Sequence, residues 1–261
     1  MFEEIKKFKD LIVTWLALFI GVGVFFFFFG MAPATLFGHL VHIPLPTDVS
    51  FAAQFFRMME ESILPAGVTL VALGPLSALN TQTIVAFMLS FLVTFPYLLY
   101  RLVRYISPAL HTNERKAFLT VLVPAIVLFF SGALFSYKFV IPPTFKALYS
   151  YTAATGVVSI FSMEAFVSTV VTFMVVSGFL FLLPIFMVLL SFLGICPPPF
   201  WWKNWRYAQF SFLAFSAIIT LDGSGVSMVL LSLPLTGLYA VGATVAQVTH
   251  KQSITEITGT T

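Results

Sequence analysis

The chain has 261 residues, of which 59% are hydrophobic and only 9% are charged, with a formal net charge of +3. Soluble domains carry about 25% charged residues, so this composition excludes a soluble monomer and indicates an integral membrane protein. Its apolar runs have the length of membrane-spanning helices, which favours an all-α bundle over a barrel. The single cysteine, Cys196, excludes an internal disulfide.

The first predicted helix covers residues 11–37, after a charged, amphipathic lead-in over residues 1–10. No charge occurs between Asp10 and Asp48, and no small-residue cleavage site interrupts the apolar run. We therefore expect a retained membrane helix rather than a cleaved signal peptide.

Residues 38–79 are the least lipid-like part of the chain and predict a structured cap outside the membrane. Within this cap, Phe55, Met58, Met59 and Ser62 recur at helical spacing, which predicts a short amphipathic helix over residues 52–62.

Five more membrane helices are expected, over residues 80–104, 117–140, 165–192, 207–221 and 227–247. We expect an outside loop over 141–164, a polar hairpin over 194–206, and a poorly ordered tail over 248–261. Residues 1–247 then form one six-helix domain. Prolines fall inside four of the helices and are expected to bend them into a curved, concave wall. They are Pro96, Pro124, Pro184 and Pro234.

The distribution of basic residues predicts the orientation of this bundle. Ten of the 13 lysines and arginines fall on the face that holds both termini, and only Arg57, Lys138 and Lys146 fall on the other. Cytoplasmic loops carry the excess of basic residues, so both termini are expected in the cytoplasm.

The stretch 96–116 connects two predicted membrane helices by a short charged hairpin. Pro108 forces a turn, and Glu114, Arg115 and Lys116 follow just before the next apolar run. A hairpin this short holds its polar groups near one membrane surface, as a docking site for a charged peptide requires. The alternative for Glu114 is a solvated charge favoured by the start of a helix.

The hairpin and the segments after it resemble the TatC family, the multi-spanning receptor subunit of the twin-arginine protein translocase. The matching features are a proline in the second helix, an aromatic-x-x-Pro-Ala-Leu turn, and a glutamate followed by basic residues. In this chain they are Pro96, Tyr105, Pro108, Ala109, Leu110, Glu114, Arg115 and Lys116. The stretches GALFSYKFVIPPTFKAL (132–148) and SLPLTGLY (232–239) continue the resemblance in family order.

The chain departs from the family pattern at four positions. It has Lys6 and Phe8 where the family has two arginines, although Glu4 is kept. It has Leu182 where the family's fourth helix has an acidic or amide residue, and Ala240 where its sixth helix often has glutamate.

The resemblance implies a non-enzymatic receptor for the twin-arginine signal peptides of folded cargo, driven by the protonmotive force. Glu4, Lys6, Tyr105, Pro108, Glu114 and Arg115 would bind or shape the signal-peptide site. Single-helix subunits of the TatA and TatB type would pack near Thr220, Asp222 and Ser227. The expected location is the plasma membrane of a bacterium or archaeon, where the chain contacts membrane lipids. An organelle inner membrane is the alternative location, and the chain could form a homo-oligomer.

Two other classes remain in view. A secondary transporter for a small solute predicts a polar midplane site and an internal repeat, and a structural assembly factor predicts that the hairpin tolerates neutralisation. We expect no metal site, because His39 and His42 lack a carboxylate or cysteine to complete a ligand set. No cofactor or nucleic-acid motif is found in the sequence.

Overall fold

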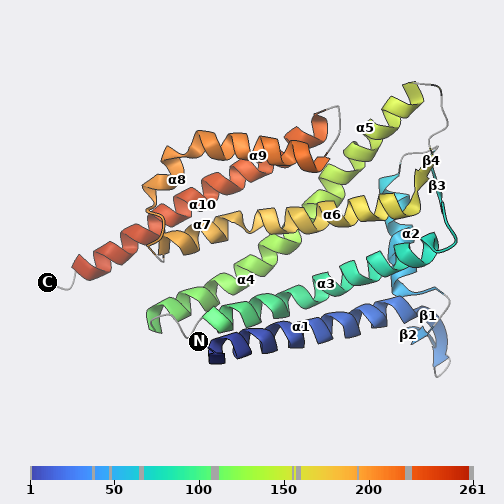
Figure 1. Cartoon of the computed structure of the whole chain (residues 1–261), viewed down its shortest axis with the longest axis horizontal. Helices are drawn as coiled ribbons and strands as arrows, with labels where there is room; N and C mark the ends of the chain where they lie inside the picture. Colours follow the sequence, from blue (N-terminus) through green and yellow to red (C-terminus); the bar gives the residue numbers. More distant parts are fainter. Residues whose placement is uncertain are drawn as a thin grey trace. The chain divides into compact units, whose positions relative to one another are not determined.

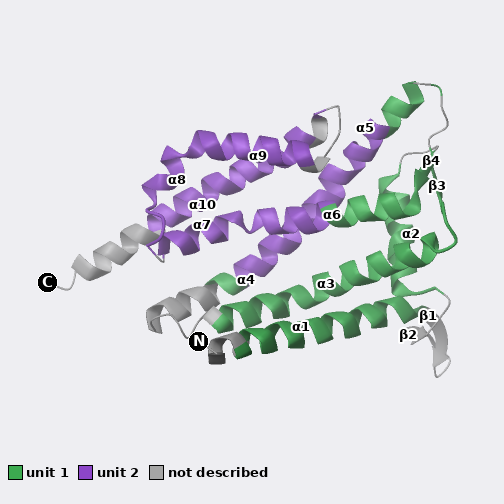
Figure 2. Ribbon diagram, viewed as in Figure 1, with its two compact units in different colours: residues 1–122, 149–172 green, residues 123–148, 173–261 purple. Residues whose placement is uncertain are grey.

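The structure is a computed structural model that describes residues 2–36, 39–46, 49–64, 68–106, 112–154, 156, 160–192, 194–220 and 225–258. The side chains of residues 2–5, 7, 32–46, 106, 112–120, 219–220, 226–227 and 249–258 lie outside that description. Two compact units divide the chain (Figure 2): residues 1–122 with 149–172, and residues 123–148 with 173–261.

Unit 1 is built on two long helices that pack along each other, α1 (Phe2–Phe28) and α3 (Ser77–Ile106) (Figure 1). The predicted first helix is therefore displaced: it begins at Phe2 rather than residue 11 and ends at Phe28 rather than 37. The charged lead-in is the first part of the helix itself. The second predicted helix, 80–104, is confirmed within three residues at each end.

The predicted cap, residues 38–79, contains the expected amphipathic helix and two strands that were not predicted, each paired with a strand from another part of the chain. Helix α2 (Phe51–Ile63) begins where the Ser50 hydroxyl accepts a hydrogen bond from the amide of Ala53 at 3.2 Å, a regular N-cap. Strand β1 (Phe29–Leu36) pairs antiparallel with β2 (His39–Pro46). Strand β3 (Thr69–Val71) pairs parallel with β4 (Ile160–Ser162).

The third predicted helix is longer at both ends than the sequence indicates. Helix α4 (Thr112–Phe135) continues through a π-helical turn, η2 (Ser136–Val140), into α5 (Ile141–Ala154). Pro142 and Pro143, predicted in a loop, therefore lie in the first turn of α5. A proline ring would clash with the carbonyl four residues earlier. The wider π-turn avoids this, and the Ile141 amide donates to the carbonyl of Ser136, five residues back.

The fourth predicted helix is interrupted, as α6 (Met163–Phe181) and α7 (Leu183–Phe192). Pro184 has no amide hydrogen to donate, so the helical ladder fails just before it. The amides of Ile185 and Phe186 instead converge on the carbonyl of Leu182, at 3.0 and 3.1 Å. Pro96, Pro124 and Pro234 lie inside continuous helices, and the bends expected at these prolines stay predictions.

Unit 2 is centred on α10 (Val226–Thr258), which packs against α7 and α9 (Trp205–Thr220). Leu231 and Leu235 of α10 are fully buried. The short helix α8 (Pro199–Lys203) precedes α9. Helix α10 continues beyond its predicted end at 247, into the stretch expected to be a poorly ordered tail.

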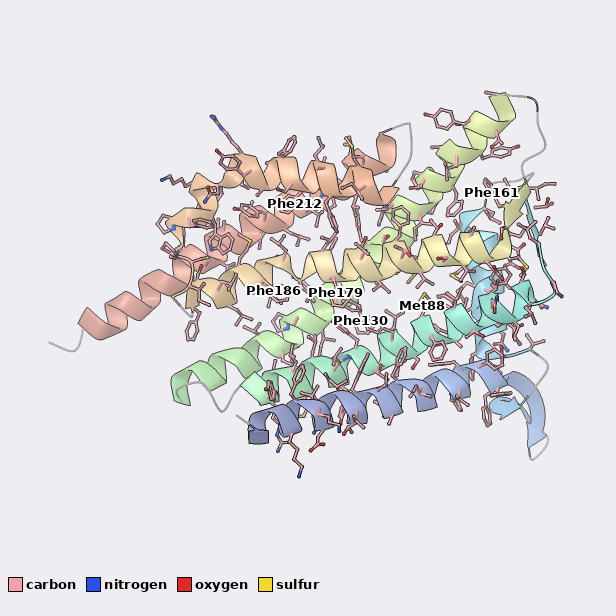
Figure 3. All side chains as sticks on the ribbon, viewed as in Figure 1. Met88, Phe130, Phe161, Phe179, Phe186 and Phe212 are labelled. Carbon is pink, nitrogen blue, oxygen red and sulfur yellow. The ribbon has the colours of Figure 1, made fainter. Side chains whose placement is uncertain are left out.

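Helices α4 and α6 approach each other closely within unit 2 because glycines stand at their contact. A β-carbon at position 132 would lie 2.6 Å from the carbonyl oxygen of Ser177, and one at position 178 would lie 2.6 Å from the Phe129 ring. The rings of Phe129 and Phe179 then meet edge to face at 5.6 Å (Phe179 is labelled in Figure 3). Small residues allow this approach in membrane helices generally.

Five stretches of helix are long and apolar enough to span a membrane among the described residues: Phe8–Phe28, Ser77–Tyr105, Val121–Ala154, Met163–Phe192 and Met228–Val248. Helix α9, the predicted fifth span, has 16 residues and a length of about 24 Å at 1.5 Å per residue. The hydrocarbon core is about 30 Å thick. The sixth span therefore stays a prediction.

We expect Gly132→Ala to destabilise the protein, because the added methyl group meets a backbone oxygen that cannot rotate away. Overpacking of this kind costs about 1–3 kcal/mol, against a gain of about 1 kcal/mol in helix propensity. Gly21→Ala is the matched control, since nothing lies within 4 Å of its β-carbon position. Thermal unfolding in detergent should give a lower Tm for Gly132→Ala than for Gly21→Ala. Equal Tm values would contradict the close packing of α4 and α6.

Candidate functional site

The start of α1 and the end of α3 meet through an aromatic contact. The rings of Phe8 and Tyr105 lie 5.4 Å apart, tilted by 50°. Phe8 lies between Lys7 and Lys9 near the start of α1, and Tyr105 follows Arg104 near the end of α3. Aromatic side chains and basic residues both favour the membrane–water interface.

A row of contacts keeps α1 and α3 antiparallel and in register along their length. The Phe19 and Phe87 rings stack at 5.4 Å, and the Ser90 hydroxyl donates a hydrogen bond to the carbonyl of Phe19. Gly23 leaves room for the Phe87 ring one turn further. This seam positions Phe8 opposite Tyr105, and with it the first turns of α1 beside the last turn of α3.

Charged residues lie near Phe8 and Tyr105 in the sequence of both helices. On α1, the side chains of Lys6, Lys9 and Asp10 are exposed. On α3, Arg104 is exposed, and Arg101 is half-buried with its guanidinium 5.8 Å from the centre of the Tyr97 ring. Its Nε atom is buried and has no hydrogen-bond partner among the described residues. This end of unit 1 is therefore cationic and aromatic.

The two predicted carboxylates lie on the first turns of helices. Glu4 is in the first turn of α1, which starts at Phe2. Helix α4 starts at Thr112, so Glu114 and Arg115 are in its first turn, rather than ahead of a helix that starts at 117. The side chains of Glu4, Glu114 and Arg115, and all of Pro108, lie outside the described residues.

The predicted partner-contact residues lie around the connection between α9 and α10. Thr220 is the last residue of α9, and Ser227 is the second residue of α10. Asp222 and the side chains of Thr220 and Ser227 lie outside the described residues. A side-chain hydrogen bond joins α9 and α10 further along: the Thr236 hydroxyl donates to Oε1 of Gln209 at 2.8 Å.

Two contacts, one at the candidate site and one near the predicted cap, could not be predicted from the sequence. Phe8 was noted only as a departure from a family pattern, yet its ring is the partner of Tyr105. Asn80 was not singled out, yet its side-chain amide donates to Oε1 of Glu164 at 3.1 Å, joining the outer ends of α3 and α6 within unit 1. Such pairs are far apart in sequence, and no local pattern reports them.

The remaining sequence expectations concern metal binding and Leu182. The described residues contain no group of three or more metal-ligating side chains, and the side chains of His39 and His42 lie outside the description. Leu182 is 3% exposed, at the break between α6 and α7. An apolar side chain suits that buried place, where an ionised carboxylate would need a partner.

Comparison with known proteins identifies the family. The model of the family "Sec-independent protein translocase protein (TatC)" matches residues 3–234. The protein of that name from Cenarchaeum symbiosum is 34% identical over 222 residues, covering 85% of this chain and 84% of the relative. The one from Deinococcus radiodurans is 31% identical and covers 65% and 64%. A chloroplastic relative from Pisum sativum is 29% identical and covers 74% and 55%.

A solved structure shows the same fold. The crystal structure of the twin-arginine translocase receptor TatC matches with a TM-score of 0.73 and 24% identity, over 94% of this chain and 98% of that one. With a family model that spans most of its length, this chain belongs to the TatC family of Sec-independent protein translocase proteins.

Proposed function

We propose that this chain is the signal-peptide receptor of a twin-arginine translocase, and that the peptide binds where α1 starts and α3 ends. The Phe8–Tyr105 contact is the observation that carries this proposal. Glu4 precedes Phe8 by about one helical turn, and Glu114 lies in the first turn of the helix that follows Tyr105. The contact therefore supports a single site with two carboxylates contributed by separate segments.

The chemistry of a paired-arginine signal suits two carboxylates. Each guanidinium presents a planar fork of donors that a carboxylate accepts in bidentate fashion, whereas a lysine ammonium is a point charge. Hydrogen bonds to charged groups contribute about 1.5–3 kcal/mol each. In the proposed site Glu114 and Glu4 bind the guanidinium groups, while Lys6, Tyr105, Pro108 and Arg115 shape the pocket.

The proposed receptor is further defined by its orientation, its sixth membrane span, its partner subunits and its energy source. Both termini lie in the cytoplasm, α9 is a sixth and short membrane span, and the bilayer thins beside it at a cost of fractions of a kcal/mol per Å. Single-helix partner subunits pack near Thr220, Asp222 and Ser227, and the protonmotive force supplies the energy. The chain itself catalyses no reaction. Bacterial, archaeal and chloroplast relatives support an energy-coupled membrane as its location.

A small-solute transporter is not favoured, because the family model describes a protein translocase. The family also works as part of a multi-subunit translocase, which supports the scaffold role over an isolated carrier.

We expect Glu114→Gln to weaken photo-crosslinking of an Arg-Arg signal peptide by at least ten-fold, because one charged acceptor contributes about 1.5–3 kcal/mol. Glu4→Gln should weaken it less. The Lys-Lys version of the peptide should crosslink poorly to every form. Glu61→Gln, an exposed carboxylate on α2, is the matched control and should behave as wild type, as should membrane insertion of all variants. Unchanged crosslinking of Glu114→Gln would reject the assigned role.

We expect Phe8→Ala to weaken the same crosslink by several-fold, because loss of the ring releases the start of α1 from Tyr105. An aromatic pair contributes about 0.5–1.5 kcal/mol beyond its buried area. Phe8→Tyr should retain near wild-type crosslinking. Phe28→Ala, at the other end of the same helix and 58% exposed, is the control. If Phe8→Ala and Phe28→Ala behave alike, the contact does not position the site.

A further inference from the structure

The end of α8 and the start of α9 carry two cations, each directly after a tryptophan in the sequence. Trp202 and Lys203 close α8, Asn204 separates the helices, and Trp205 and Arg206 open α9. We name Trp202, Lys203, Trp205 and Arg206 the tryptophan–basic edge. The Trp202 and Trp205 rings stack at 5.5 Å with 17° between their planes, and the Lys203 and Arg206 side chains are exposed.

Part-buried hydrogen bonds and a ring contact join this edge to the rest of unit 2. The Trp201 indole donates to the Ser191 hydroxyl at 2.8 Å, and the Tyr239 hydroxyl donates to the Trp201 carbonyl at 2.7 Å. The Tyr239 ring also contacts the Trp205 ring at 5.5 Å. The edge is thus joined to α7 and α10, and its exposed cations project from a fixed support.

The stretch of sequence around these two cations holds no acidic residue. Residues 165–221 contain no aspartate or glutamate, and Lys203 and Arg206 are the only charged residues in that stretch. The acidic residues in the sequence of unit 2 are Asp222 and Glu256. Glu256 lies about 25 Å beyond Tyr239 along α10. An anion from another molecule can therefore pair with the two exposed cations.

We infer that the tryptophan–basic edge binds the phosphate headgroup of an anionic phospholipid. The surroundings of the edge favour a lipid over a water-soluble anion. Phe200, Tyr207 and Phe210 beside it are 44%, 75% and 72% exposed, a surface that suits acyl chains. Indole rings favour the headgroup level of the bilayer, and each basic residue near an anionic surface adds to lipid attraction. This site belongs to unit 2, whereas the proposed peptide site belongs to unit 1.

The test uses the full-length protein in nanodiscs of phosphatidylcholine with a photoactivatable phosphatidylglycerol. In wild type, phosphatidylglycerol crosslinks should map to residues of α8 and the first turns of α9. The double variant Lys203→Gln/Arg206→Gln should lose phosphatidylglycerol association by about twenty-five-fold, about five-fold for each charge. Crosslinking of photoactivatable phosphatidylcholine should not change, and high salt should weaken the wild-type signal.

The matched control is Lys138→Gln/Lys146→Gln, which removes two exposed cations from the same unit and should leave crosslinks at α8 and α9 unchanged. Circular dichroism and size-exclusion elution of the nanodiscs check that every variant is folded and inserted. If the double variant fails to insert, the inference is tested by whether the wild-type phosphatidylglycerol crosslinks map to α8 and the first turns of α9. A wild-type map without α8 and α9, or equal phosphatidylglycerol and phosphatidylcholine crosslinking there, would overturn the inference.

Discussion

The need to satisfy backbone hydrogen bonds without water governs this fold. In lipid, each unpaired amide or carbonyl costs several kcal/mol, so apolar segments have to be helical. Prolines then decide where the helical ladder changes, because they supply no donor. Pro142 and Pro143 are accommodated by the π-turn η2, and Pro184 by the interruption at Leu182. The same residue type thus has two structural outcomes in neighbouring helices.

Hydropathy and charge predict the apolar segments because they act over whole spans. The predicted helix ends are wrong where single contacts decide them. Charged residues predict the helix starts too late, since α1 and α4 both begin several residues earlier, within charged stretches. Strands β1 and β2 were missed because Pro33, Pro44 and Pro46 argue against a sheet interior, although a two-stranded ribbon tolerates proline.

A local sequence motif proposes residues for the candidate site, but it does not predict how they assemble. Glu114 and Tyr105 come from a local motif, and the motif does not say which part of the chain lies beside it. That information resides in the α1–α3 seam, where Phe19, Phe87 and Ser90 set the register. Phe8, at a position where the family pattern has a cation, packs its ring against Tyr105. Its role could not be read from its residue type.

The π-turn has a consequence for sequence comparison. A wide turn holds one residue more than an α-turn, and each helical residue advances the azimuth by about 100°. Consider a relative whose corresponding segment is a regular α-helix. It has to lack one residue between 136 and 140 if the residues of its next helix are to face the same way as those of α5. Without that gap in an alignment, every position after Val140 is assigned to the wrong helical face.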